Sequence, residues 1–270
     1  MNYGQKFAVE TAPMAGYTTA EFRSVLINLG ARTVWTEMVS VAAIFYGQRG
    51  SLEKTQKLLE IPTSDKKVKH IVQIFGKTPE HFRFAIKSGH LDGFDEININ
   101  MGCPANKIVR NGEGVALMTK PELAREIIQT CVKASKVPVS VKMRLGKERG
   151  FDYVSFAKMC EDAGAVRLVV HGRYGEQGYS GTADWGAVSE IVGAVKIPVV
   201  ANGDVKDIET AKQCLDITKA SGVMVGRALL PIYRKYFDTN LRILRGEKIC
   251  RDGNINPNSF DVCRLFGTQD

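Results

Sequence analysis

Residues 94–104 read FDEININMGCP, an apolar run that ends in a cysteine held between Gly102 and Pro104. The run has the composition of a β-strand, and the cysteine follows at the point where the strand ends. In a barrel of parallel strands, the carboxyl ends of the strands form the functional face. The stretch therefore predicts such a barrel, with the Cys103 thiol at its mouth, where it can donate a proton to a bound molecule.

Seven further runs of apolar and β-branched residues predict strands in the rest of the chain. They occupy residues 7–13, 33–38, 68–75, 137–144, 166–171, 197–202 and 222–225. Segments with helical spacing lie between most of them, at residues 79–88, 121–135, 153–163, 185–192 and 207–215. Because strand and helix alternate, the strands are expected to pair in parallel, and their nearly all-apolar character indicates burial on both faces.

Eight such units in a chain of 270 residues predict an α/β fold of the TIM (β/α)8 barrel type. A doubly wound open sheet is the alternative, and the absence of Gly-x-Gly-x-x-Gly after the first strand disfavours it. We predict one domain, the barrel, over residues 1–233. Residues 234–270 are predicted to form a short helical and irregular C-terminal tail, because residues 228–245 have helical spacing and residues 254–259 are rich in turn formers.

The composition, 44% hydrophobic and 24% charged, favours a folded globular chain over a disordered one. No signal-peptide pattern and no long apolar stretch is seen, so we expect a cytoplasmic protein without membrane association. The six cysteines and four histidines lack the spacing of a metal site, so no metal is predicted. Cys131, Cys160 and Cys214 fall in helix-like segments and are predicted to be core residues.

The formal net charge of +8 favours an anionic partner such as nucleic acid, although many basic enzymes carry such a charge without binding it. Polar residues also follow the predicted strands, and barrel geometry brings them around one mouth. These residues are Gln73, Asn100, Cys103, Lys142, Arg144, His171, Arg173, Asn202, Asp204 and Arg227. Glycines beside Asn202, Asp204 and Arg227 free backbone N–H groups, so the ends of the last two strands predict a phosphate site.

Seven ordered segments resemble the dihydrouridine synthase family of flavin enzymes over about residues 5–230. They are APMAG at 12–16, QIFG at 73–76, NINMGCP at 98–104, VKMRLG at 141–146, HGR at 171–173, ANGD at 201–204 and GR at 226–227. The cysteine segment and the lysine segment in this order are the most specific of the seven.

The resemblance implies a molecule of FMN across the barrel mouth. Its ring system would contact Pro13, Met14, Ala15, Gln73, Lys142 and His171. Its phosphate would fall to Asn202, Gly203, Asp204, Gly226 and Arg227, in agreement with the phosphate site predicted from the strand ends.

The resemblance also implies that NADPH reduces the flavin, that hydride passes to carbon 6 of a uracil in RNA, and that Cys103 protonates carbon 5. The product is dihydrouridine. An unactivated thiol is mostly protonated at neutral pH, which suits this role. Asn100, Arg144 and Arg173 are candidates for contacting the base. Transfer RNA is the favoured substrate and ribosomal RNA is an alternative.

Two departures from the family pattern stand out. The predicted tail is shorter than the helical RNA-binding domain usual in the family, which leaves the grip on RNA open. Glu113 stands in the loop after Cys103, where the family favours a small residue.

Two other functions are alternatives: an FMN-dependent reductase of a free small molecule, of the dihydroorotate or ene reductase type, and a non-catalytic RNA-binding barrel. The oligomeric state, the uridine position and the choice between NADPH and NADH are left open.

Overall fold

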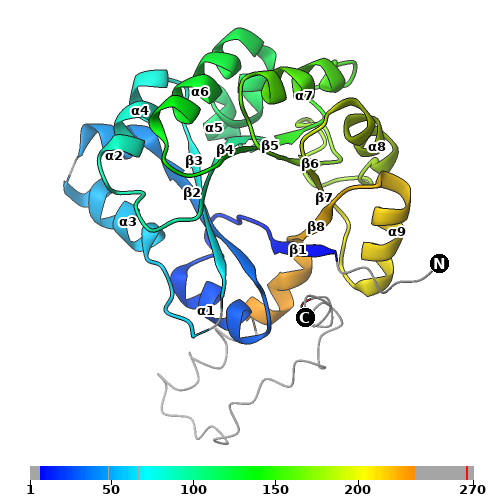
Figure 1. The fold of residues 1–270 in the computed structure, drawn as a ribbon, viewed down its shortest axis with the longest axis horizontal. Helices are drawn as coiled ribbons and strands as arrows, with labels where there is room; N and C mark the ends of the chain where they lie inside the picture. Colours follow the sequence, from blue (N-terminus) through cyan, green and yellow to red (C-terminus); the bar gives the residue numbers. More distant parts are fainter. Residues whose placement is uncertain (1–6, 48, 66, 235–265, 267–270) are drawn as a thin grey trace, which may run out of the picture.

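The computed structural model describes residues 7–47, 49–65, 67–234 and 266. Eight parallel strands form one sheet in the order β1-β8-β7-β6-β5-β4-β3-β2. Their bounds are β1 Ala8–Thr11, β2 Thr33–Ser40, β3 Lys69–Phe75, β4 Glu96–Met101, β5 Val139–Arg144, β6 Leu168–His171, β7 Val199–Asn202 and β8 Gly222–Val225. Figure 1 shows these strands as a ring, with the helices outside it. The predicted TIM barrel and all eight predicted strands are confirmed.

The ring closes between its first two strands through side chains. The Thr11 hydroxyl donates to the Thr33 carbonyl oxygen at 3.4 Å, and the Trp35 indole N–H donates to Glu10 at 3.0 Å. The register of β2 against β3 shifts between Trp35 and Met38, which marks a bulge. A bulge bends its strand and redirects side chains, and here Met38 beyond it faces the barrel mouth.

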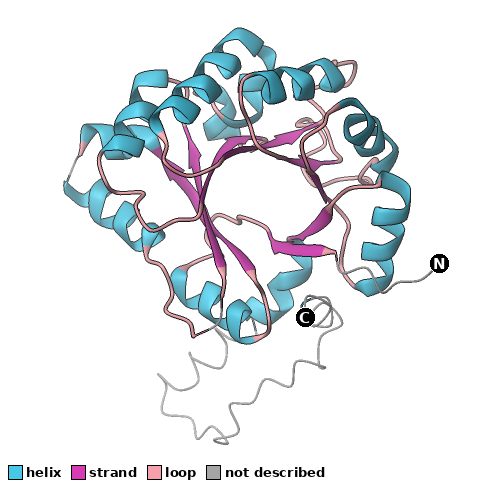
Figure 2. Ribbon diagram, viewed as in Figure 1, coloured by secondary structure: helices cyan, strands magenta, loops and turns pink. Residues whose placement is uncertain are grey.

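Helices cover the outside of the barrel (Figure 2). The five predicted helices are confirmed as α4 Pro79–Lys87, α6 Pro121–Ala134, α7 Tyr153–Asp162, α8 Trp185–Ala194 and α9 Ile208–Thr218. The structure adds α1 Ala20–Asn28, α2 Val41–Tyr46, α3 Arg49–Leu59, α5 Asn106–Arg110 and the 3₁₀ turns η1 Gly114–Thr119 and η2 Arg227–Leu229. The starts of α1 and α2 follow capping rules, since the side chains of Thr19 and Ser40 accept from N–H groups in the first turns of these helices.

The core has two parts. The larger part lies between the strands and the helices and includes Cys131, Cys160 and Cys214, which are buried in α6, α7 and α9 as predicted. The smaller part lies inside the barrel and consists of Ala12, Trp35, Ile71, Val169, Val200 and Met224. Burial on both faces explains why strands β6, β7 and β8 consist entirely of buried residues.

Buried charges close the amino-terminal end of the barrel. Arg167, just before β6, contacts Glu10 of β1 at 2.7 Å and Glu96 of β4 at 2.9 Å. Lys69, the first residue of β3, contacts the second oxygen of Glu96 at 2.7 Å. The guanidinium of Arg167 also lies 5.5 Å from the centre of the Trp35 ring. Side chains from five strands or strand starts are therefore joined at the end of the barrel opposite the mouth.

The predicted tail falls mostly outside the described residues. Residues 231–234 continue in helical conformation after η2, and Phe266 is buried against Gly30, where a methyl group would come within 3.3 Å of its Cβ. The division into residues 1–233 and 234–270 therefore stays a prediction. Within residues 7–47, 49–65 and 67–234, no helix is long and apolar enough to cross a membrane. The same residues contain no cluster of three or more potential metal ligands.

We expect Arg167→Met to lower the free energy of unfolding by about 3–5 kcal/mol, because Glu10 and part of Glu96 lose their buried partner. Urea unfolding followed by circular dichroism measures the change. The matched control is Arg83→Met, which breaks an ion pair whose two side chains are each 63% exposed and has little effect on stability. Equal losses in the two variants would contradict a stabilising role for the buried charges.

Candidate active site

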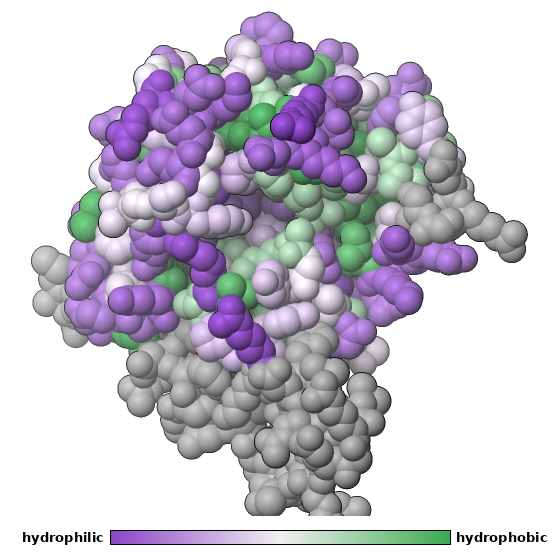
Figure 3. Space-filling model, turned by 180° about the vertical axis from the view of Figure 1, so that it is seen from behind, coloured by the Kyte–Doolittle hydropathy of each residue, from purple (hydrophilic) through white to green (hydrophobic). Residues whose placement is uncertain are grey.

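A cavity of about 1470 Å³ opens at the carboxyl ends of the strands. Figure 3 shows it as a hollow near the middle of the face opposite to that of Figure 1, bordered by both apolar and hydrophilic residues. Side chains from the ends of all eight strands line it. Of the predicted site residues, the following line the cavity: Pro13, Met14, Ala15, Gln73, Asn100, Cys103, Lys142, Arg144, His171, Asn202, Gly203, Asp204, Gly226 and Arg227. Arg173 does not.

One wall of the cavity is apolar. It contains Ala12, Pro13 and Met14 after β1 and Met224 of β8. The Met14 backbone is held by Thr18, whose hydroxyl accepts from the Met14 N–H at 3.1 Å. The Ala12 N–H donates to the Val225 carbonyl oxygen at 2.7 Å, which holds this wall against β8. The wall can accept one face of a flat aromatic ring.

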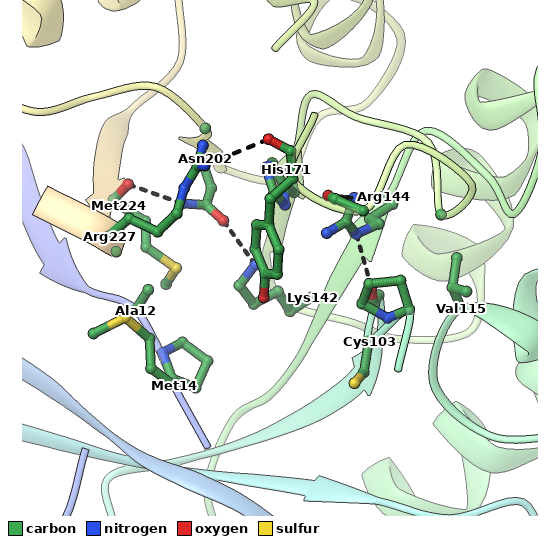
Figure 4. Close-up of a pocket in the computed structure, with 18 of the residues that line it drawn as sticks. Ala12, Met14, Cys103, Val115, Lys142, Arg144, His171, Asn202, Met224 and Arg227 are labelled. Carbon is green, nitrogen blue, oxygen red and sulfur yellow. Dashed lines mark hydrogen bonds between the residues drawn. The ribbon is translucent and has the colours of Figure 1, made fainter. Parts of the chain in front are cut away.

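Lys142 crosses the cavity from β5. Its ammonium donates to the Asn202 side-chain oxygen at 2.8 Å, and the Asn202 amide donates to the Met224 carbonyl oxygen at 2.9 Å. Figure 4 shows Lys142 between Asn202 on one side and Cys103 on the other, with Ala12, Met14 and Met224 on the Asn202 side. Burial, with Arg144 nearby, lowers the pKa of Lys142 to about 7. An anion or an electron-rich ring edge beside it would restore its charge.

The Cys103 loop, residues 102–105 between β4 and α5, is fixed by hydrogen bonds to its backbone. The side-chain oxygen of Asn100 accepts from the N–H groups of Gly102 at 3.1 Å and Cys103 at 2.9 Å. The Arg144 Nε donates to the Gly102 carbonyl oxygen at 2.9 Å, and the Val115 N–H donates to that of Cys103 at 3.1 Å. Burial raises the pKa of the Cys103 thiol, although the nearby positive charges of Arg144 and Lys142 offset part of the rise. The thiol is therefore protonated at neutral pH and can act as an acid.

Residues 174–181, between β6 and α8, form a strap beside the cavity. Arg144 donates to the carbonyl oxygens of Tyr174 at 2.9 Å and Gly178 at 2.8 Å. Arg173 donates to those of Ser180 at 3.1 Å and Gly181 at 2.7 Å. The Arg144 guanidinium is thus shared between the Cys103 loop and the strap, and most of its donors are already engaged.

Tyr179 of the strap is a cavity residue that the sequence did not single out. Its side chain is 61% exposed, and its ring centre lies 5.7 Å from the Arg144 guanidinium and 5.3 Å from that of Arg227. It spans the two sides of the mouth. The local signal, a tyrosine in the glycine-rich run of residues 175–181, predicts a turn and gives no direction for the ring.

Asp204 orients the arginines at the predicted phosphate site. Its carboxylate accepts from Arg173 at 2.8 Å, from Arg227 at 3.2 Å and from the Ala183 N–H at 2.7 Å. These contacts hold its pKa below the ordinary value despite partial burial. Gly203 before it has a φ of +118°, and a Cβ there would lie 2.7 Å from that of Ala183, so only glycine fits.

His171 is neutral at physiological pH. Burial lowers its pKa, as do the neighbouring charges of Lys142, Arg144, Arg173 and Arg227. Its Nε2 lies 3.3 Å from an Arg173 N–H group, and because a guanidinium can only donate, Nε2 is the acceptor and Nδ1 carries the proton. Arg173 is only 1% exposed, so it reaches the cavity through His171 and Asp204.

The chain is similar to known proteins over most of its length. A family model described as dihydrouridine synthase matches residues 10–233. A probable tRNA-dihydrouridine synthase from Rickettsia bellii is 41% identical over 217 residues, 80% of this chain and 65% of that protein. One from Synechocystis is 37% identical over 81% of this chain and 60% of that protein. A tRNA-dihydrouridine synthase B from Xanthomonas axonopodis is 38% identical over 80% of this chain and 64% of that protein. The chain thus spans less than two thirds of the length of these relatives.

Solved structures with low sequence identity support the fold alone. Phosphonopyruvate hydrolase superposes with a TM-score of 0.61 at 14% identity, covering 98% of this chain and 91% of that one. A 2-naphthoyl-CoA reductase superposes with a TM-score of 0.64 at 10% identity, covering 88% of this chain and 50% of that one.

Gly114 is expected to be irreplaceable beside Cys103. It has a φ of +61°, and a Cβ there would lie 2.6 Å from the Cys103 carbonyl oxygen and 2.9 Å from an Ile108 methyl group. Gly114→Ala should therefore cost about 2 kcal/mol more in unfolding free energy than Gly47→Ala, measured by urea unfolding. Gly47 is the matched control because its φ is +56° with nothing within 4 Å of a Cβ. Similar losses of unfolding free energy in the two variants would mean that the strain of a positive φ explains the cost without the contacts to Cys103 and Ile108.

Lys142 should give the protein a pH-dependent stability. Its pKa is about 7 in the folded protein and 10.5 ordinarily, so between these values the unfolded chain binds more protons and the free energy of unfolding rises with pH. Below a pH of about 7, Lys142 is protonated in both the folded and the unfolded chain, and burial of its charge then lowers the free energy of unfolding by the full amount. We expect the stability of the unsubstituted protein to rise relative to Lys142→Gln in urea unfolding between about pH 7 and 10. Parallel pH profiles would contradict the lowered pKa.

Proposed function

Because the chain belongs to the dihydrouridine synthase family, we propose that it reduces the carbon 5–carbon 6 double bond of a uracil in RNA, using FMN, with NADPH as reductant and Cys103 as the acid. The observation that carries the proposal is the position of a protonated thiol across the cavity from an apolar wall, with Lys142 between them (Figure 4). The product is dihydrouridine.

The residues of the cavity fit FMN. The flat apolar wall of Ala12, Pro13, Met14 and Met224 suits a ring face, and Lys142 supplies a donor toward a polar ring edge. Gln73 of β3 lines the same cavity. Gly203 and Gly226 free the backbone for a phosphate, and the half-exposed Arg227 supplies a positive charge. A cavity of about 1470 Å³ leaves room for a pyrimidine beside the ring system.

Reduced FMN, when bound, supplies the hydride that carbon 6 of the uracil accepts. The Cys103 thiol gives its proton to carbon 5, which leaves a thiolate that regains a proton from water. Arg144 and Lys142 stabilise that thiolate, since both already offset the effect of burial on its pKa. His171 is neutral and carries its proton on Nδ1, so it can donate a hydrogen bond to a bound molecule without adding a positive charge to the site.

The predicted base-contacting residues take different roles in this proposal. Asn100 and Arg144 line the cavity and can touch the base, but their hydrogen bonds are mainly committed to the Cys103 loop and the strap. Arg173 acts through His171 and Asp204. Tyr179, exposed at the mouth between two guanidinium groups, is the residue best placed to stack on a base or on its neighbour.

Transfer RNA is the proposed substrate, because the relatives carry that substrate in their names and the net charge is +8. Lys147, Lys206 and Arg227 line the cavity and can meet phosphates at its rim. The uracil must leave its stack to enter, which costs a few kcal/mol and favours a nucleotide in a loop. We place the enzyme in the cytoplasm, where the free thiol of Cys103 stays reduced.

We expect Cys103→Ala to retain FMN and to lower the rate of dihydrouridine formation by at least about 100-fold, because the acid is lost and the phosphate site is intact. Flavin absorbance gives the FMN content, and mass spectrometry of treated transfer RNA gives the product. The matched control is Cys131→Ala, which removes a thiol buried in α6 and far from the mouth.

Three results would contradict the proposal. If the purified protein is colourless, takes up no FMN when FMN is added, and shows no flavin reduction by NADPH, the proposed flavin chemistry is excluded. An unsubstituted enzyme that reduces a free pyrimidine but not RNA points to the small-molecule reductase. Full activity of Cys103→Ala removes the assigned role of the thiol.

A further inference from the structure

A chain of hydrogen bonds runs through the barrel from the Cys103 loop to the buried charges at its base. The side chains that form it, from Asn100 to Glu96, are at most 7% exposed. The links are Cys103 N–H to Asn100 at 2.9 Å, Asn100 to Gln73 at 2.8 Å, Gln73 to Asn98 at 2.8 Å, Asn98 to Ser140 at 2.8 Å and Ser140 to Glu96 at 2.5 Å. It joins β3, β4 and β5, so it lies beneath the loop that carries the thiol.

All the donors in this chain point in one direction, away from the mouth. The oxygen of each side-chain amide accepts a hydrogen bond from the neighbour nearer the mouth. Its nitrogen donates a hydrogen bond to the neighbour nearer the closed end of the barrel. The Ser140 hydroxyl accepts from Asn98 and donates to Glu96. No link has two donors or two acceptors facing each other.

Both ends of the chain require that direction, since the Gly102 and Cys103 N–H groups can only donate and the last member can only accept. Glu96 presents a carboxylate, which can only accept, and it is held by Lys69 and Arg167 at 2.7 and 2.9 Å. Ser140 must therefore donate to Glu96 and accept from Asn98. The same rule then orients the amides of Asn98, Gln73 and Asn100 in turn, and the Asn100 oxygen faces the two N–H groups of the Cys103 loop.

We infer that Ser140 and Asn98 are positioning residues for the Cys103 thiol, acting through the amide orientation of Gln73 and Asn100. If the chain breaks at Ser140, the Asn98 amide loses its acceptor, and the amides above it are then held in their orientation from the mouth end alone, so they turn over more readily. A turned Asn100 would present its NH₂ group to the N–H groups of Gly102 and Cys103, and the loop would loosen. The importance of this inference for catalysis rests on the proposed function.

The rest of the barrel interior argues against a general packing role for these polar residues. Ile71, Val169, Val200 and Met224 fill the equivalent space with apolar side chains. Buried amides and hydroxyls are costly unless every hydrogen bond is made, and apolar residues of similar size replace them readily. The polar members occur instead in one connected line that ends at the Cys103 loop.

The test removes one hydroxyl group from the chain. We expect Ser140→Ala to lower the single-turnover rate of dihydrouridine formation about tenfold, because small displacements of a reacting group are costly. The KM for RNA and the FMN content should not change. Iodoacetamide should alkylate Cys103 about threefold faster, because the loop opens more often. Peptide mass spectrometry measures that rate without any need for turnover.

Two controls separate positioning from loss of stability. Ser140→Thr keeps the hydroxyl and should restore both rates. Thr218→Val removes a buried hydroxyl that donates to a carbonyl oxygen in α9, far from the chain, and should leave both rates unchanged. If Ser140→Ala does not fold, Asn98→Leu breaks the chain at the neighbouring link and should give the same two changes.

If the turnover and alkylation rates of Ser140→Ala were the same as those of Thr218→Val, the inference would be overturned. If the unsubstituted enzyme forms no dihydrouridine, the proposed function fails, and alkylation alone then decides: a faster rate in Ser140→Ala supports the positioning role and an equal rate refutes it.

Discussion

The hydrogen bonds from the Gly102 and Cys103 N–H groups to the Asn100 side chain are the contacts on which the site depends. They turn the backbone sharply at the end of β4, so that the cysteine lines the mouth instead of continuing the strand. Arg144 holds the same turn through the Gly102 carbonyl oxygen. Because Arg144 also holds the strap that carries Tyr179, the two sides of the mouth are joined through one guanidinium.

The barrel interior has a polar side and an apolar side. The polar side follows β3, β4 and β5 and leads from the Cys103 loop to the buried charges around Glu96. The apolar side includes Val169 of β6 and Val200 of β7 and ends in the wall of Ala12, Met14 and Met224. This division places the Cys103 thiol on one side of the mouth and a surface for a flat ring on the other, which is the arrangement on which the proposed reduction depends.

Positive charge is concentrated at the mouth before any anion binds. Lys142, Arg144, Arg173 and Arg227 all lower the pKa of His171, and Arg144 also lowers that of Lys142. Asp204 balances part of this charge and fixes two of the guanidinium groups in place. A site built in this way favours a phosphate and an electron-rich ring, since both relieve repulsion that the folded chain otherwise carries.

The sequence alone determined the eight strands and the barrel, because period and apolar runs are local features. Its strand-end residues, together with the family resemblance, supplied most of the predicted residues that line the cavity. It missed α1, α2, α3 and α5, of which α1 and α2 begin at the side-chain caps Thr19 and Ser40. Tertiary structure decided the rest. Arg167 and Glu10 meet across 157 residues of sequence, Arg173 lies behind His171 instead of in the cavity, and Tyr179 reaches the mouth only because arginines from three strand ends hold its loop. The direction of the hydrogen bonds beneath Cys103 is likewise invisible in the sequence, since it depends on which side chains from neighbouring strands face each other inside the closed barrel.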